Sequence, residues 1–344
     1  MTGKPPLRLM LDGAALVANW RWLAARSGRA ACGAAIKADG YGLGARPVLE
    51  RLAAAGCRDF FLTTWHEVEA LGALPDGVAL SVLHGVRDED MPRALASPAR
   101  PTLNSAEQVR RWRDAGGGLC DVMVNTGMNR LGMAVQDVAD GLLDGLSIDT
   151  LMSHLASADE DVPRNERQRA MFAALAGKTG ARRMSLANSA GICLGPAYHF
   201  DLTRPGLALY GGIPRGEAAG HIAQVAQPEA QIIQRRRIAA GESVGYNATF
   251  TADRPMELAI LNIGYADGYL RGFSNRGSAG GGRFPVIGRV SMDLLAIGVD
   301  AEPGLGEGDW VPVDFDLPTA SAQSGLAQYE LLTALGGRFE RVWA

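Results

Sequence analysis

The chain has 344 residues, of which 47% are apolar and 21% are charged, and its formal net charge is −3. This composition is typical of a globular protein with a sizeable core and excludes disordered and fibrous classes. The small acidic balance gives no basic surface for a nucleic acid or an anionic membrane, so we expect neither as a partner. No apolar run approaches the roughly 20 residues that span a bilayer, and the opening MTGKPPLRLMLDG has no signal-peptide pattern, so we expect a cytoplasmic protein.

From residue 14 to about residue 220, short apolar runs alternate with longer segments at helical spacing. Strands are predicted at Cys32–Ile36, Phe60–Thr63, Leu80–His84, Pro101–Leu103, Val122–Val124, Leu151–His154, Met184–Leu186 and Phe200–Thr203. Helices are predicted between them, among others at Ala45–Ala55, Ser105–Ala115, Val135–Leu143 and Asn165–Ala176. This alternation predicts an α/β fold, a (β/α)8 TIM barrel over residues 10–225, with a doubly wound open sheet as the alternative architecture.

After about residue 225 the pattern changes to strands separated by Gly, Asp and Pro turns. Strands are predicted there at Gln231–Ile238, Leu258–Ile263, Phe284–Val290, Leu294–Val299 and Val311–Phe315, followed by a helix at Ser321–Leu335. We therefore predict a second, mainly β domain over residues 226–344, to which an N-terminal strand in residues 1–10 is added.

Several reactive side chains lie where predicted barrel strands end. These residues are Lys37, Arg130, His154, Asn188, Ser189 and Arg204. Because the carboxyl ends of barrel strands form the active-site face, we expect the side chains to converge there. Each also has an ordinary structural interpretation, such as a core histidine, a surface arginine, or a lysine whose stem lies along the core. Alternatively, partial burial lowers the pKa of a lysine and makes it a Schiff-base nucleophile.

Two glycine-rich segments lie near these residues. The spacing G-x-G-x-G at Gly40–Gly44 differs from the dinucleotide-binding pattern G-x-G-x-x-G. The segment Arg204–Gly212 follows the last barrel strand, where backbone N–H groups often bind phosphate and Gly206 permits close approach; a simple turn is the alternative. The five histidines have no metal-binding spacing, so we expect no metal site.

The segment AIKADGYGLG around Lys37 resembles the cofactor-lysine motif of the alanine racemases, a fold type III family that uses pyridoxal 5'-phosphate (PLP). The segment NTGMNRLGM around Arg130 resembles the family's substrate-arginine motif. Further blocks resemble the family in the same order along the chain: SHLASAD (153–159), ANSA (187–190), RPGLALYG (204–211), GESVGYNAT (241–249), IGYADG (263–268) and GRVSMD (288–293). Because the resemblance extends from residue 9 to about residue 340, it implies the family's fold and activity for nearly the whole chain.

The resemblance implies how PLP is held. The residues that would contact the cofactor are Lys37, Tyr41, Asn188, Ser189, Arg204 and Gly206. Lys37 would bind PLP covalently, and Arg204 would face the pyridine nitrogen. Because an arginine is effectively always charged, it keeps this nitrogen unprotonated and makes the cofactor a weaker electron sink, which limits side reactions.

The resemblance also implies a two-base mechanism, since racemisation needs a base on each face of Cα. Lys37 would serve the D-face, and Tyr246 of the other subunit would serve the L-face. An unperturbed tyrosine has a pKa of about 10, so His154 and Arg204 are expected to assist Tyr246. The residues implied to contact the substrate are Arg130, Met292 and Tyr265. We therefore expect a head-to-tail homodimer in which the β domain completes the partner subunit's active site and D-alanine is made for peptidoglycan.

Three positions depart from the family pattern. Met123 stands where many relatives have a lysine, which is carbamylated in some. Asn125 stands where an aspartate is common, so a chloride or a water is a candidate support for Arg130. Gly337 stands where some relatives have a tyrosine, which leaves the phosphate contacts and the range of substrates open.

Other functions are weighed against alanine racemisation. A racemase of broader specificity would share every motif above. PLP-dependent amino-acid decarboxylases have the same architecture but place a carboxylate at the pyridine nitrogen, and Arg204 disfavours them. A non-catalytic PLP-binding protein would lack the second domain and hence Tyr246. A sugar-phosphate enzyme with a Schiff-base lysine would leave the β domain unexplained.

Overall fold

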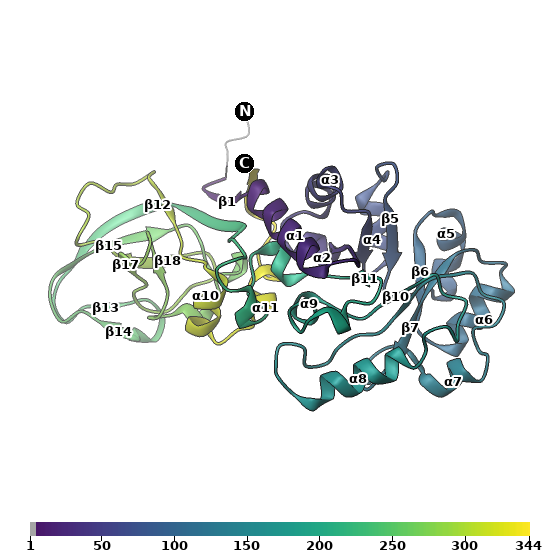
Figure 1. The fold of residues 1–344 in the computed structure, drawn as a ribbon. Coiled ribbons are helices and arrows are strands. Elements are labelled where there is room, and N and C mark those ends of the chain that lie inside the picture. The colour runs from purple at the N-terminus through teal and green to yellow at the C-terminus, as the bar shows by residue number, and fades with distance from the viewer. Residues whose placement is uncertain (1–4) are drawn as a thin grey trace.

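The computed structural model describes residues 5–344, and Figure 1 shows a barrel of parallel strands surrounded by helices beside a separate β domain. The chain enters through β1 (Leu7–Leu11) in the β domain and continues into α1 (Gly13–Ser27) of the barrel. The Asp12 side chain caps α1 by accepting from Ala15 N (2.8 Å), and Gly28 ends the helix at φ +65°. Among residues 5–344, no helix is long and apolar enough to cross a bilayer.

Parallel strands form the barrel wall in chain order. They are β2 (Ala31–Cys32), β3 (Ala34–Ala35), β4 (Asp59–Leu62), β5 (Ala79–Val82), β6 (Arg100–Leu103), β7 (Cys120–Asn125), β9 (Ile148–Met152), β10 (Arg183–Ser185) and β11 (Leu202–Thr203). β11 pairs with β2, and on its other side Asp201 N, directly before β11, donates to Met184 O of β10 (3.0 Å). These bonds close the ring, which confirms the predicted barrel and excludes the open sheet.

The helices around the barrel follow the predicted periodicity. α3 (Ala45–Ala55) has the predicted bounds, and α6 (Ala106–Asp114) begins after Ser105, whose side chain caps it. α8 (Pro163–Ala173) begins two residues earlier than predicted, with proline in its first turn. α7 (Val135–Ala139) is shorter than predicted because the chain turns at Gly141 with φ +87°. The remaining barrel helices are α2 (Lys37–Tyr41), α4 (Trp65–Leu71), α5 (Met91–Ala96) and α9 (Ser189–Cys193).

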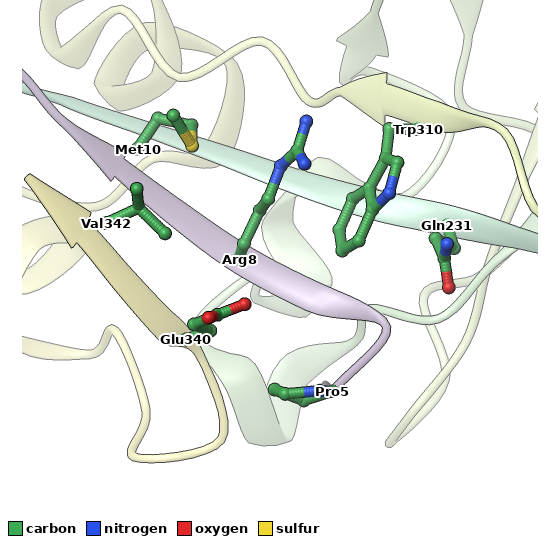
Figure 2. A pocket seen from close by; sticks show the side chains of 7 residues that line it. All are labelled: Pro5, Arg8, Met10, Gln231, Trp310, Glu340 and Val342. Atoms are coloured by element: carbon green, nitrogen blue, oxygen red, sulfur yellow. The ribbon is translucent and has the colours of Figure 1, made fainter. Parts of the chain in front are cut away.

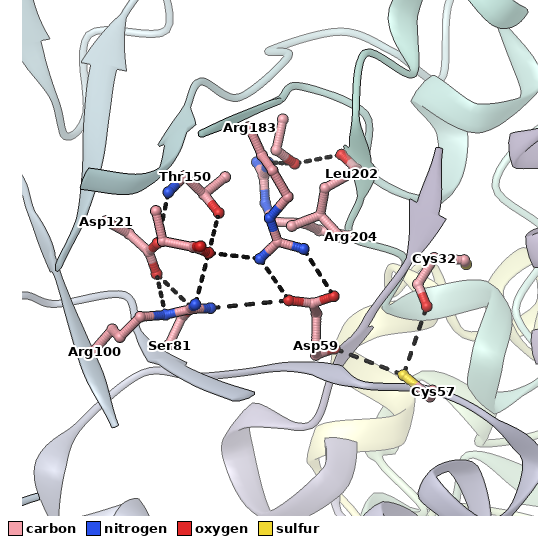
Figure 3. Close-up of polar contacts among 12 residues, drawn as sticks. Cys32, Cys57, Asp59, Ser81, Arg100, Asp121, Thr150, Arg183, Leu202 and Arg204 are labelled. Carbon is pink, nitrogen blue, oxygen red and sulfur yellow. Dashed lines mark hydrogen bonds and ion pairs between the residues drawn. The ribbon is translucent and has the colours of Figure 1, made fainter. Parts of the chain in front are cut away.

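A buried cluster of charges fills the barrel near the amino ends of its strands (Figure 3). Arg183 donates to both oxygens of Asp59 (2.7 and 3.0 Å), and Arg100 donates to Asp149 Oδ2 (2.6 Å). Asp121 lies 3.5 Å from Arg100 Nε, and burial raises the pKa of its carboxyl to about 6. Since isolated buried charges are very costly, this mutual pairing is what allows a polar barrel floor.

The β domain contains a six-stranded sheet in the order β18–β15–β12–β1–β20, with β19 paired to β12. Its strands after β1 are β12 (Ala226–Ile238), β15 (Met256–Leu261), β18 (Leu295–Gly298), β19 (Trp310–Pro312) and β20 (Glu340–Trp343). β1 pairs antiparallel with β12 and parallel with β20. The first and the last strand of residues 5–344, β1 and β20, are therefore neighbours in one sheet.

Two predictions for the β domain are wrong. The helix expected at Ser321–Leu335 is divided into α10 (Leu317–Ser324) and α11 (Gln328–Thr333), because Gly325 adopts φ +74° and ends the first helix. The strand expected at Phe284–Val290 is reduced to β17 (Phe284–Pro285) and a single bridge from Val286 to Ile297, and the backbone turns at Gly288 with φ +76°.

Candidate active site

A cavity of about 830 Å³ lies at the carboxyl ends of the barrel strands. Its lining includes eight of the predicted site residues: Lys37, Tyr41, Arg130, His154, Asn188, Ser189, Arg204 and Gly206. These side chains come from loops after five different strands, so the barrel brings together residues that are up to 169 positions apart, counting from Lys37 to Gly206. The expected convergence on one face is therefore found.

A smaller cavity of about 330 Å³ lies on the β domain, where Arg8 of β1 and Trp310 of β19 face each other (Figure 2). The Arg8 guanidinium lies 4.1 Å from the Trp310 ring centroid and forms an ion pair with Glu229. The charge of Arg8 is thus already matched within the sheet, and this cavity offers no comparable set of reactive groups.

A left-handed turn places Lys37 in the large cavity. Ala38, Asp39, Gly40 and Tyr41 have φ values of 52°, 51°, 63° and 56°. A left-handed residue other than glycine costs roughly 1–2 kcal/mol, so such a turn persists only where its surroundings hold it. Glu67 Oε1 accepts from Ala38 N (2.6 Å), and Asp39 Oδ1 accepts from Ala45 N (2.8 Å). Gly40 lies within this turn, and Gly42 and Gly44 follow it with φ values of 87° and 103°, so all three glycines of the G-x-G-x-G segment occupy left-handed positions.

The Lys37 ammonium is disfavoured in this position. Burial and the positive charge of Arg130 lower the pKa of Lys37 below its usual value, and Arg204 contributes in the same direction. The negative charge of Glu67 opposes them. A larger neutral fraction of the amine makes Lys37 a better nucleophile and proton acceptor.

One end of the cavity forms a small cradle of Tyr41, Asn188, Ser189 and Gly206. The Ser189 hydroxyl accepts from Gly206 N (3.0 Å) and Ala208 N (3.3 Å). Tyr41 stacks on Tyr210 at 4.6 Å between ring centroids, and burial raises the pKa of the Tyr41 phenol. The phenol therefore stays protonated and can donate a hydrogen bond to an anion in the cradle.

Arg204 and His154 line the same cavity as Lys37. The Arg204 guanidinium donates to Ser153 O (2.6 Å) and to the Ser185 hydroxyl. Burial lowers the pKa of Arg204 to about 10, so it is still a cation at neutral pH. Burial, followed by the charges of Arg204 and Arg130, lowers the pKa of His154 to about 3. The imidazole is therefore neutral, and within residues 5–344 its ring has no hydrogen-bond partner.

The other three predicted site residues lie outside this cavity, on the β domain. Tyr246 is 63% exposed and Met292 is 53% exposed. Tyr265 N donates to Ser291 O (3.0 Å) and Ala266 N donates to Met292 O (3.0 Å), which fixes Tyr265 and Met292 as neighbours. A single chain thus carries two separate sets of predicted site residues.

Comparisons with known protein families match both the barrel and the β domain of this chain. Residues 11–214 match the model of the alanine racemase N-terminal domain, and residues 225–343 match that of the alanine racemase C-terminal domain. The chain belongs to the alanine racemase family. The predicted resemblance is thereby confirmed, and the protein is an enzyme of the racemase class.

Individual alanine racemases are similar to this chain over nearly their full length. An alanine racemase of Acidiphilium cryptum is 42% identical, with 97% of this chain and 98% of the relative covered. A biosynthetic alanine racemase of Agrobacterium fabrum is 39% identical, with 98% and 93% covered. The crystal structure of the Bartonella henselae alanine racemase, which has covalently bound pyridoxal phosphate, superposes with a TM-score of 0.91 at 33% identity, covering 98% and 99% of the two chains.

Two of the three positions that depart from the alanine racemase pattern, Met123 and Asn125, line the cavity together with Arg130. The Arg130 side chain is exposed and has no ion pair or hydrogen bond in the part of the chain that the structure describes. Met123 lines the cavity as an apolar side chain. Asn125 Oδ1 accepts from Gly127 N and Asn129 N (both 3.0 Å), so it shapes the loop and does not support the guanidinium. Arg130 is therefore left free to pair with an anion from outside the chain.

Sequence reasoning missed several lining residues of this alanine racemase cavity. The largest is Tyr329 of α11, whose ring centroid lies 6.4 Å from that of Tyr41. Thr333 of the same helix and His84, which follows β5, also line the cavity. Tyr329 and Glu330 are adjacent in the sequence, but nothing in the sequence indicates that α11 reaches across to the barrel.

Proposed function

We propose that this chain is a PLP-dependent enzyme that interconverts L-alanine and D-alanine. The observation that carries the proposal is one cavity that combines Lys37, whose pKa is lowered, with the unpaired cation of Arg130 and with the cradle. Covalently bound pyridoxal phosphate in the Bartonella henselae relative supports the cofactor.

PLP fits the cavity through its three polar groups. Lys37 would bind its aldehyde carbon, the cradle would hold its phosphate, and Arg204 would face its ring nitrogen. The contact between Gly206 and Tyr41 supports the second assignment, because a Cβ at position 206 would lie 2.2 Å from the Tyr41 hydroxyl and fill the cradle. When bound, PLP withdraws electrons from the attached amino acid and makes its Cα proton removable.

The residues of this chain would then control where the proton moves. Because Arg204 remains a cation, it would keep the ring nitrogen of bound PLP unprotonated, which would limit electron withdrawal and make well-placed bases necessary. Lys37 serves the D-face of Cα, and Tyr246 of the partner subunit serves the L-face. Neutral His154 acts as a hydrogen-bond partner for this tyrosine, and Arg130 binds the substrate carboxylate.

A head-to-tail homodimer with shared active sites follows from this assignment. Tyr246 and Met292 are large and exposed, and Tyr265 is fixed beside Met292 on the same domain. We propose that residues 226–344, with the strand at the start of the chain, form the domain that completes the partner subunit's site. Residues 10–225 then form the PLP-binding barrel.

We further propose that the enzyme acts in the cytoplasm and supplies D-alanine for peptidoglycan. A biosynthetic and a catabolic alanine racemase of Agrobacterium fabrum are each 39% identical to this chain, so a catabolic role is the alternative. A broader substrate range remains the second candidate, because no atom lies within 4 Å of a Cβ built on Gly337, which leaves space at a position where some relatives carry a tyrosine.

The decisive assay uses the purified, PLP-loaded protein with each L-amino acid in turn. Chiral chromatography should detect conversion of L-alanine to a racemic mixture, and Lys37→Ala should abolish it. Borohydride reduction should attach PLP to the peptide that contains Lys37. Absence of racemisation by the wild type, or attachment to Lys178 instead, would reject the proposal, and comparable turnover of bulkier amino acids would favour the broader racemase.

A further inference from the structure

We propose that Gln168 is a positioning residue for racemisation, which fixes the His154 loop against the loop that carries Arg130. This inference rests on the proposed function. Gln168 lies on α8, is 1% exposed and does not line the cavity. It therefore acts through other residues and does not touch substrate or cofactor.

The Gln168 amide connects two loops by three hydrogen bonds. Its Nε2 donates to His154 O (2.9 Å) and to Thr126 Oγ1 (3.2 Å). Its Oε1 accepts from Ala156 N (2.9 Å). His154 and Ala156 follow β9, whereas Thr126 follows β7 and begins the loop that leads to Arg130. One side chain thus spans the ends of neighbouring barrel strands.

The same network continues to Arg204 through buried groups. The Thr126 hydroxyl bonds to the Ser153 hydroxyl (2.8 Å), which also donates to Val124 O (2.8 Å). Ser153 O in turn accepts from Arg204 Nη2 (2.6 Å). Gln168 is therefore the outer end of a continuous path that holds the two loops and the arginine in one arrangement.

His154 depends on this path for its orientation. Within residues 5–344 no hydrogen bond holds its imidazole, whereas Gln168 holds the His154 carbonyl and so fixes the backbone from which the ring projects. Misplacement of a reacting group by about 1 Å can cost roughly 100-fold in rate. We infer that loss of the amide lowers the rate of racemisation without emptying the cofactor site.

The chemistry of the contact requires a donor and an acceptor on one side chain, which an amide supplies and an ionised carboxylate does not. In Gln168→Glu, ionised glutamate keeps the acceptor for Ala156 N but offers no donor to His154 O or Thr126 Oγ1. Once protonated, the carboxyl has nearly the shape of the amide and regains one donor. Burial favours the protonated form, so the variant should recover activity as the pH falls.

The experiment compares kcat/KM for L-alanine between pH 8.5 and 6 in PLP-loaded wild type, Gln168→Glu and Asn165→Asp. Asn165 is a matched control, because it lies on the same helix, is 2% exposed and donates to Ser157 O (3.0 Å) and Glu160 O (2.8 Å), farther from His154. PLP content and melting temperature are measured for every protein.

We expect Gln168→Glu to lose roughly 10- to 100-fold in kcat/KM at pH 8.5 with PLP content retained, and the ratio to wild type to rise as the pH falls. Asn165→Asp should lose thermal stability, but its ratio to wild type should not vary with pH. Gln168→Met, which fills the same space without hydrogen bonds, should be slow at every pH and covers the case in which the buried glutamate prevents folding. A ratio for Gln168→Glu that stays low at every pH, or wild-type activity in Gln168→Met, would overturn the proposal. Failure of the proposed function is distinguishable, because the wild type itself would then be inactive.

Discussion

The hydroxyl of Tyr41 lies so close to the Cα of Gly206 that one additional methyl group would stand 2.2 Å from it. Gly206→Ala should therefore displace the Tyr41 ring and narrow the cradle, which weakens PLP binding by roughly 10-fold or more. Absorbance titration of the cofactor-free variant with PLP measures this affinity. Gly180→Ala is the control, since nothing lies within 4 Å of a Cβ built there. Equal affinity in the two variants would show that the cradle does not hold the phosphate.

Two inactive variants should complement each other if active sites are shared. Lys37→Ala removes a site residue of the barrel, and Tyr246→Phe alters a site residue of the β domain. If each site combines one barrel with the partner's β domain, a heterodimer of the two variants has one site with both substitutions and one site with neither. Random mixing through reversible dissociation should restore roughly a quarter of the wild-type activity. Activity is followed after mixing, and native mass spectrometry verifies the heterodimers. If heterodimers form and activity stays at the level of the separate variants, both residues act within one chain's site.

Exchange of the Cα proton with solvent deuterium should distinguish the roles of the two proposed bases. In Tyr246→Phe, Lys37 still removes the proton from D-alanine, whereas the L-face has lost its base. Deuterium from the solvent should then enter D-alanine faster than L-alanine, while interconversion falls roughly 10²–10⁴-fold, the usual worth of a general base. NMR follows both exchange rates. Equal slowing in both enantiomers, with PLP content intact, would indicate a single base for both faces.

His154 should make the fold more sensitive to acid. Its pKa is lowered from 6.5 to about 3, by burial first and then by Arg204, so the unfolded chain binds a proton below pH 6.5 that the folded chain refuses. Stability is therefore lost as the pH falls from 6.5 towards 3, with a slope of at most about 1.4 kcal/mol per pH unit. His154→Gln should flatten this loss in urea unfolding at pH 7, 6 and 5. The exposed His66→Gln should reproduce the wild-type curve, and a His154→Gln curve identical to it would contradict a neutral His154 imidazole in the folded chain.

The barrel and its site could be predicted where the apolar spacing along the sequence matches the elements that the fold contains. The apolar spacing of Ala45–Ala55 alone gives the bounds of α3. Lys37 and Arg204 were found because both follow strands, and parallel strands of a barrel end on the same face. The bounds of the later elements failed at Gly288 and Gly325, where positive φ values interrupt an otherwise continuous pattern. A glycine in a sequence permits such a turn without requiring it.

Other features depend on contacts that no local pattern encodes. Gln168 is one of many polar residues in α8, and only the meeting of two loops after different strands distinguishes it. The left-handed run from Ala38 to Tyr41 depends on Glu67 and on packing of the barrel. Tyr246 is a site residue only by resemblance, because its place beside Lys37 needs a second chain.

The charged floor of the barrel makes the active-site cavity a dead end. Arg100, Arg183 and their three aspartates pack the strand interior below Arg204, so within residues 5–344 the barrel is a plug and not a pore. Substrate must enter, and product must leave, by the mouth at the carboxyl ends of the strands. Substrate entry, product release and proton exchange with bulk water thus all occur through one opening. Any surface that covers this opening therefore affects the rates of all three.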